Sequence, residues 1–261
     1  MLPEIYSRLP PKLQDMSYHE PFLGGGSVAL RLMSGIITKD FVISDVNPEL
    51  MMMYRVVRDN PQEIIDILKQ HPNDPNHYIE VREWDRDPNA FAQYSDIERA
   101  ARLIYLNRTC YNGLFRVNSK GQFNMAFASY SNPTICDSQT ILDVSTFLNR
   151  SGVTLSCGDF QMVLKGIRNP AMTFAYLDPP YDETYTSYTS GGFGKQDQRR
   201  LKDVCDDLNS KGVKFMLSNS KTDYILNLYS SYQIDTIKAK RSINRNSAGR
   251  GCIDEVIIKN Y

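Results

Sequence analysis

The fold is decided by the stretch from residue 173 to residue 181, which reads Thr-Phe-Ala-Tyr-Leu-Asp-Pro-Pro-Tyr. Its first five residues are apolar or β-branched and predict a buried strand, which the two prolines end because proline lacks a backbone N–H. In an open α/β sheet, the residues that follow the strands line the ligand-binding crevice. Asp178, the Pro179 carbonyl and the ring of Tyr181 therefore suit a planar base that carries an amino group. The alternative is a rigid turn that only ends the strand.

Further strands and helices alternate on both sides of this stretch. Short apolar or β-branched runs predict strands at residues 41–44, 153–157, 213–218 and 254–258. Helical patterns are found at residues 48–58, 61–69, 97–107, 138–149, 196–209 and 222–229. This alternation predicts an α/β fold with a doubly wound sheet.

One part of the chain interrupts the alternation. Residues 61–149 are mostly helical and include a predicted hairpin, with its two arms at residues 114–117 and 122–125. We therefore expect residues 1–60 and 150–261 to form one domain, and residues 61–149 to form an inserted second lobe.

A glycine-rich turn, Pro-Phe-Leu-Gly-Gly-Gly at residues 21–26, follows a short strand candidate. Glycines allow a ligand to approach the backbone closely, although a tight structural turn explains them equally well. Asp45 lies about 20 residues further on, after the next predicted strand, where open α/β sheets place an acid that binds ribose hydroxyls. The pair predicts a nucleoside-bearing cofactor. The glycine spacing is not the G-x-G-x-x-G of NAD enzymes.

Composition excludes several classes of protein. The 261 residues are 41% hydrophobic and 23% charged, close to the average of folded globular proteins. We find no apolar run of the length that a membrane helix needs and no signal-peptide pattern at the first residues, so we expect a cytoplasmic protein. The five cysteines are widely spaced and form no C-x-x-C pair, which predicts reduced thiols and no metal site.

Charge is balanced overall but uneven along the chain, because 30 basic and 30 acidic side chains are distributed unequally. Residues 99–125 carry Arg99, Arg102, Arg108, Arg116 and Lys120 without any acid. Residues 238–250 are also basic and lack acids. Such segments are either solvated faces or contacts to nucleic acid.

Jointly, these motifs resemble the DNA adenine-N6 methyltransferases of the GATC-methylating (Dam) type, which use S-adenosylmethionine (AdoMet). The shared motifs also include Asp-Val-Asn-Pro-Glu-Leu at residues 45–50, Gly-Asp-Phe at 158–160, Leu-Ser-Asn-Ser at 217–220 and Asn-Arg at 107–108, with a Tyr-Asn-Gly-Leu stretch at 111–114. The glycine motif precedes the variable lobe and the Asp-Pro-Pro-Tyr motif follows it, as in the family's α group. The resemblance runs from about residue 18 to the end of the chain.

This resemblance implies the fold of class I methyltransferases, a Rossmann-like doubly wound mixed sheet, with AdoMet as cofactor and no metal. Phe22, Gly24 and Gly25 would line the methionine part of AdoMet, and Asp45 would hold its ribose. Asp159 and Phe160 would meet the adenine of the cofactor, which Asp178 would also border.

The resemblance also implies the chemistry. Asp178 and the Pro179 carbonyl would accept hydrogen bonds from the N6 amino group of the target adenine, while Tyr181 stacks on the flipped base. Two acceptors make the delocalised N6 lone pair more nucleophilic, so that the methyl group moves directly and in line. Tyr185 begins a segment that resembles the family's mobile loop.

DNA contacts are implied for the hairpin, with double-stranded DNA as partner. Arg116 would read a guanine, with Asn118 and Asn124 beside it and Lys120 on a phosphate. We expect Tyr105 and Tyr111 to be core residues, and leave Arg99 and Arg102 open between DNA contacts and solvated helix residues. We expect a monomer, with a dimer on DNA as the alternative, in a bacterial or phage setting close to the nucleoid.

Two departures from the family pattern qualify these expectations. Residues 126–130 read Ala-Phe-Ala-Ser-Tyr where the family usually has Pro-(Phe/Tyr)-Gly-(Arg/Lys)-Tyr, so the recognition sequence is open between GATC and a variant. A Trp-x-Gly-Gly-Lys-like segment, which contacts AdoMet in the family, is not found before the glycine motif, and this predicts weak AdoMet binding. The alternatives are an inactive DNA-binding remnant and a cytosine-N4 methyltransferase, but Asp178 favours adenine because the cytosine enzymes more often have Ser there.

Overall fold

The computed structural model describes residues 1–33, 35, 38–182, 192–240 and 252–261, and these form two compact units. The first contains Met1–Val46 and most of the chain after Ser151, and we call it the sheet unit. The second contains Asn47–Arg150, and we call it the helical unit. None of the helices in the described residues is long and apolar enough to cross a membrane.

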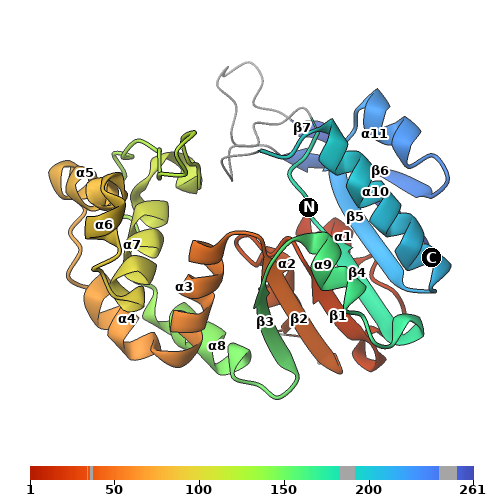
Figure 1. Ribbon diagram of the computed structural model, residues 1–261, viewed down its shortest axis with the longest axis horizontal. Coiled ribbons are helices and arrows are strands. Elements are labelled where there is room, and N and C mark those ends of the chain that lie inside the picture. Colours follow the sequence, from red (N-terminus) through yellow and green to blue (C-terminus); the bar gives the residue numbers. More distant parts are fainter. Residues whose placement is uncertain (34, 36–37, 183–191, 241–251) are drawn as a thin grey trace. The chain divides into compact units, whose positions relative to one another are not determined.

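The sheet unit is built on one seven-stranded sheet, shown in Figure 1. Its strands are β1 (Ser17–Glu20), β2 (Asp40–Asp45), β3 (Val153–Cys157), β4 (Thr173–Leu177), β5 (Lys214–Ser220), β6 (Gln233–Lys240) and β7 (Cys252–Lys259). Their order is β3-β2-β1-β4-β5-β7-β6. Strands β1 to β5 run parallel, and β7 runs antiparallel to both of its neighbours. The predicted doubly wound mixed sheet is confirmed.

Helices of the sheet unit connect and cover the strands. They are α1 (Leu2–Tyr6), α2 (Ser27–Met33), α9 (Phe160–Lys165), α10 (Lys195–Ser210) and α11 (Asp223–Leu228), with short 3₁₀ turns at Leu13–Asp15 and Pro170–Met172. Every residue of β4 is buried, as expected for a parallel strand covered on both faces. One core cluster joins this strand to α10 through Leu177, Phe215, Leu201 and Leu208.

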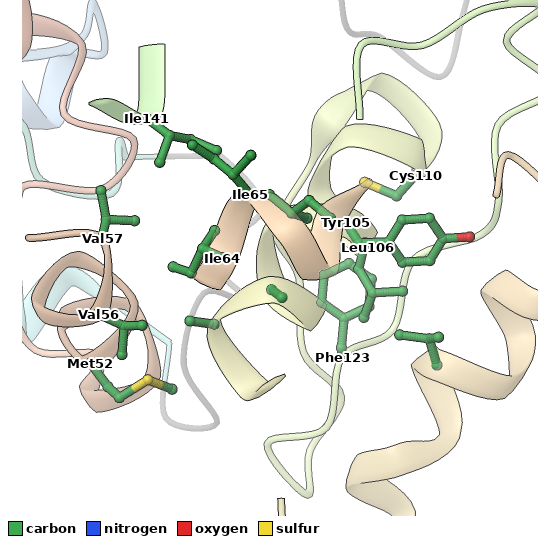
Figure 2. Packing of buried hydrophobic residues seen from close by; sticks show 14 of the residues in the cluster. Met52, Val56, Val57, Ile64, Ile65, Tyr105, Leu106, Cys110, Phe123 and Ile141 are labelled. Carbon is green, nitrogen blue, oxygen red and sulfur yellow. The ribbon is translucent and has the colours of Figure 1, made fainter. Parts of the chain in front are cut away.

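The helical unit packs its helices around a core of its own. They are α3 (Pro48–Asp59), α4 (Pro61–Leu68), α5 (Pro75–Glu83), α6 (Pro88–Phe91), α7 (Asp96–Thr109) and α8 (Ser138–Leu148), with 3₁₀ turns at Trp84–Arg86 and Tyr111–Gly113. Asn47, Asp74 and Asp87 cap three of these helices by accepting backbone hydrogen bonds just before a proline at the first helical position. Figure 2 shows Ile64 and Ile65 of α4 near Tyr105 and Leu106 of α7 in this core.

Two features of the helical unit differ from the sequence-based prediction. The unit begins at Asn47 rather than at residue 61, because α3 places Met52, Val56 and Val57 in the same core as α4 and α7. The predicted hairpin is a loop with two isolated antiparallel bridges, Val117 with Phe123 and Cys110 with Phe127, rather than a pair of strands. Two backbone hydrogen bonds still connect its arms, from the Asn118 N–H to the Gln122 carbonyl and from the Asn124 N–H to the Arg116 carbonyl.

We expect Ile64→Ala to lower the free energy of unfolding by about 2–5 kcal/mol, because Ile64 is fully buried (0% exposed) and its loss leaves a cavity. Ile79, in α5 of the same unit, is 48% exposed, so Ile79→Ala should change stability by no more than about 0.5 kcal/mol. Urea denaturation followed by helical circular dichroism measures both variants. Equal losses in the two would contradict the assignment of this core.

Candidate active site

The glycine-rich turn lies at the end of β1 and is tied to the end of β2. Gly24 has a φ of +48°, a conformation that favours glycine, and its N–H donates a hydrogen bond of 3.0 Å to Asp45 Oδ2. The Leu23 N–H donates to the Ser44 carbonyl at 2.9 Å. A Cβ placed on Gly24 or Gly25 would meet no atom within 4 Å, so the backbone here faces open space. This turn can therefore accept a ligand at close range.

The end of β3 brings a second acid to the same edge of the sheet. Asp45 pairs in register with Cys157, and the Gly158 N–H donates to the Asp45 carbonyl at 3.0 Å. Asp159 follows as the cap of α9, where its Oδ1 accepts a hydrogen bond from the Gln161 N–H at 2.9 Å. Asp45 is thus the last residue of β2, and Asp159 comes two residues after the end of the neighbouring strand β3.

An aromatic cluster accompanies Asp159. The rings of Phe160 and Phe22 lie with centroids 5.1 Å apart. Arg200 of α10 donates to Asp159 Oδ2 at 2.9 Å, and its guanidinium lies 4.7 Å from the centroid of the Phe160 ring. Sequence reasoning did not find Arg200, because it comes from a helix distant in the chain. Arg200 thus contacts both Asp159 and Phe160.

Two exposed apolar side chains were also missed. Val46, directly after Asp45, is 51% exposed, and Met162, in the first turn of α9, is 70% exposed. Each therefore offers apolar surface next to a site acid, which suits the face of a planar ring. Val46 lies in the quoted motif of residues 45–50, but the exposure of a single side chain cannot be read from sequence.

The Asp-Pro-Pro-Tyr turn follows β4, the strand that pairs with β1. Protein atoms displace water from the Asp178 carboxylate, and this desolvation raises its pKa from 3.8 to about 6. Within that value, a hydrogen bond from Tyr181 lowers the pKa and the negative charge of Glu255 raises it. Asp178 nevertheless keeps an exposed face, so that water screens the carboxylate in part and a base can reach it. Pro179 is buried and Tyr181 is half-buried. The structure thus gathers the three predicted catalytic residues on one turn.

A second carboxyl group lies beneath this turn at the end of β1. Glu20 is 2% exposed, and its Oε2 accepts a hydrogen bond of 2.5 Å from the Tyr18 hydroxyl. Burial raises the pKa of Glu20 to about 8; the hydrogen bond from Tyr18 lowers it, and the negative charge of Asp178 raises it. Glu20 is therefore largely protonated at neutral pH. The sequence analysis predicted no role for it.

The predicted DNA-contacting residues of the helical unit lie on the hairpin loop. Arg116 donates to the Asn124 carbonyl at 3.1 Å, and Lys120 and Asn124 are exposed. Asn118 builds the turn itself, since its Oδ1 accepts from the backbone N–H groups of Lys120 at 2.9 Å and Gln122 at 3.1 Å. Tyr185 and most of the basic segment of residues 238–250 lie outside the described residues.

The base of this hairpin is anchored by a buried ion pair. Arg102 is 5% exposed and lies 2.8 Å from Asp85 Oδ2, which also accepts the Phe123 N–H at 2.8 Å. Arg99 pairs with Glu49. The interpretation of Arg102 as a solvated helix residue is therefore wrong, because its guanidinium is needed to neutralise Asp85.

Of the two tyrosines expected in the core, one is buried and one is not. Tyr105 is 0% exposed and confirms the expectation, but Tyr111 is 50% exposed. Helix α7 ends at Thr109, and Asn112 adopts a left-handed φ of 58° that turns the chain outward. The Tyr130 hydroxyl accepts the Asn112 N–H at 3.0 Å and stabilises this turn.

A sequence model described as D12 class N6 adenine-specific DNA methyltransferase matches residues 1–243. The chain belongs to this family. A Type II methyltransferase of Lactococcus lactis subsp. cremoris is 40% identical over 268 residues, covering 100% of this chain and 91% of its own. A DNA adenine methylase of Vibrio cholerae is 30% identical over 250 residues, covering 91% of this chain and 84% of its own. Among solved structures, an rRNA methyltransferase from Streptomyces viridochromogenes aligns with a TM-score of 0.37 and 13% identity over 99% of this chain and 82% of its own.

Membership of the D12 class confirms the predicted family and the predicted enzyme type, an AdoMet-dependent methyltransferase that acts on adenine in DNA. The cytosine-N4 alternative is wrong, because the matching family is adenine-specific. Among the residues that the structure describes, no group of three or more His, Cys, Asp or Glu side chains is arranged to hold a metal ion.

In this D12-class protein, we expect the stabilising contribution of Glu20 to be lost as the pH rises from about 4.5 to about 8. Its folded-state pKa of about 8 exceeds the ordinary value of 4.5, so the folded state binds more protons than the unfolded state between these values. Glu20→Gln should therefore make the slope of unfolding free energy against pH more positive in this range. Glu63→Gln on the exposed surface of α4 is the control. Identical slopes for the two variants would show that Glu20 titrates normally.

Proposed function

We propose that the sheet unit binds AdoMet and methylates the N6 amino group of an adenine in double-stranded DNA that the helical unit recognises. The observation that carries this proposal is the Asp-Pro-Pro-Tyr turn after β4, which follows a strand directly paired with the strand that leads into the glycine turn. The crevice outside such neighbouring strand ends, where the strand order reverses, is the usual ligand site of this architecture. An adenine-specific family supplies the target.

The residues around the glycine turn fit AdoMet. Gly24 and Gly25 face open space and, with Phe22, offer a lining for the methionine part of the ligand. Asp45 accepts hydrogen bonds from the ribose hydroxyls, since a carboxylate oxygen accepts more than one. Asp159 and Phe160 recognise the adenine of the cofactor by an acceptor and an apolar face. When bound, AdoMet supplies an electrophilic methyl group on a sulfonium centre.

The Asp-Pro-Pro-Tyr turn prepares the target amine. Asp178 and the Pro179 carbonyl accept hydrogen bonds from the two N6 hydrogens, which directs the nitrogen lone pair toward the methyl group. As the bond between N6 and the methyl group forms, the bond between that methyl group and the sulfonium sulfur would break, and one N6 proton would leave to solvent. Because its amino group is paired inside a duplex, the adenine leaves the base stack, and the ring of Tyr181 stacks on it. A carboxylate with a pKa of about 6 is mostly ionised at neutral pH and can act as this acceptor.

The hairpin loop of the helical unit contacts DNA. Arg116 reads a guanine edge in the major groove, Asn118 and Asn124 support it, and Lys120 binds a phosphate. Tyr111 joins them as an exposed aromatic residue on the turn just before the hairpin. We propose that a single chain acts on bacterial or phage DNA in the cytoplasm, near the nucleoid.

We expect Asp178→Ala to slow single-turnover methyl transfer by about 100-fold or more without unfolding the protein, because the carboxylate acts at the reacting amine. The parental rate should rise as the pH increases through about 6, where Asp178 ionises, and Asp178→Asn should lose this rise. Asp207→Ala is the control, since Asp207 forms an exposed ion pair with Lys211. Transfer of labelled methyl groups to DNA measures the rates. A near-parental rate in Asp178→Ala would disprove the catalytic role.

Arg116→Ala should weaken binding of the preferred sequence by about 1–3 kcal/mol and relax discrimination at one base pair. Lys120→Ala should weaken binding to all DNA sequences alike. It should also lower, by about one, the slope of the logarithm of the binding constant against the logarithm of the salt concentration. Titration of cognate and substituted duplexes at several salt concentrations separates the two effects. A uniform loss over all sequences in Arg116→Ala would exclude base readout by this residue.

A further inference from the structure

Two buried side-chain amides hold the peptide groups on both sides of Tyr181. Gln198 of α10 donates a hydrogen bond of 2.9 Å from Nε2 to the Pro180 carbonyl. Asn219 of β5 accepts the Asp182 N–H on Oδ1, also at 2.9 Å. Gln198 is 1% exposed and Asn219 is 0% exposed. The backbone before and after Tyr181 is therefore fixed from two different elements of the sheet unit.

The two amides are also joined to each other. Asn219 Nδ2 donates to Gln198 Oε1 at 3.2 Å, and Asn219 Oδ1 accepts a second hydrogen bond from the Ser220 N–H at 2.9 Å. Asp182 is held once more by the Thr222 hydroxyl, which donates to its Oδ2 at 2.7 Å. These bonds form a connected buried network, in which the loss of one member leaves its partners unsatisfied.

The local sequence explains why side chains are needed here. Strand β4 ends at Leu177, and Pro179 and Pro180 have no N–H with which to continue a sheet ladder. The turn that carries Tyr181 must therefore be held by groups from elsewhere in the chain. An amide supplies both a donor and an acceptor, and only two amides are needed to fix both peptide groups.

We propose that Gln198 and Asn219 are positioning residues that set the orientation of the Tyr181 ring over the target base. This inference rests on the proposed role of Tyr181 in stacking on that base. Rotation of either peptide group would swing the ring, and a displacement of about 1 Å at a reacting centre can cost about 100-fold in rate. The amides act through Tyr181 and do not touch the substrate.

The chain offers a matched control for this proposal. Asn260 also bridges backbone groups near β5, because its Oδ1 accepts the Phe215 N–H at 2.8 Å and its Nδ2 donates to the Val213 carbonyl at 2.9 Å. These bonds lie at the opposite end of the strand from Asn219. Asn260→Leu thus removes these two bonds, and a third from Nδ2 to Asn209 Oδ1, without touching the catalytic turn.

The test compares Gln198→Met, Asn219→Leu and Asn260→Leu, which replace each amide by an apolar side chain, alone and combined with Tyr181→Ala. Folding is checked by circular dichroism. At saturating DNA and AdoMet, we expect the first two variants to slow methyl transfer by about 10-fold to 100-fold. Their KM for AdoMet should stay within about 3-fold of the parental value, because the AdoMet site is intact. Asn260→Leu should keep the parental rate even if it melts at a lower temperature.

The combined variants distinguish positioning from general destabilisation. If the amides act through Tyr181, adding Gln198→Met to Tyr181→Ala should change the rate by less than about 2-fold, because the effects of substitutions at interacting residues do not add. Emission of 2-aminopurine at the target position should change in Gln198→Met as it does in Tyr181→Ala, and stay parental in Asn260→Leu.

Two results would overturn the inference: additive losses in the combined variants, or equal loss of rate in Asn260→Leu. Parental turnover by Tyr181→Ala alone would instead reject the proposed stacking role on which the inference rests. The two failures are thus separable in a single set of measurements.

Discussion

Strand β1 pairs in parallel with β2 on one side and with β4 on the other, and this pairing determines where the chemistry can occur. Parallel strands end at the same edge of a sheet, so the segments that follow these three strands leave together. The glycine turn follows β1, the Asp-Pro-Pro-Tyr turn follows β4, and Asp45 is the last residue of β2. Any change in strand order would separate the groups proposed to bind AdoMet from those proposed to hold the target amine.

The sequence was most informative where a residue's environment is set by its own strand. Strands β2 to β5 and β7 were predictable because buried strands are continuous apolar runs, and the acids that follow them were predictable by position. Strand β6 was missed because its residues, Gln-Ile-Asp-Thr-Ile-Lys-Ala-Lys, include too few apolar side chains to form such a run. Helix α5 has a weak apolar pattern and was missed for a related reason.

Residues whose role depends on distant partners were not predictable. Arg200, Gln198 and Asn219 act on turns that lie far from them in sequence, and a single sequence does not show which turn a helix face meets. Tyr111 was placed in the core because aromatic residues near a helix are usually buried. Its exposure follows from the left-handed Asn112, which no local pattern required. Arg102 was left open because only the fold reveals that Asp85 lies beside it.

The hairpin of the helical unit has a base that is fixed to the core and a tip that is exposed. Its base is fixed by Asp85, which bonds both Arg102 and the Phe123 backbone, while Ser119, Lys120 and Gly121 at the tip are exposed. Substitutions at the tip leave the buried ion pair in place. In the DNA contacts proposed above, Lys120 meets a phosphate, so drift at the tip can change how strongly the loop holds DNA without unfolding the protein. The same division makes the tip a suitable place for designed changes in DNA affinity.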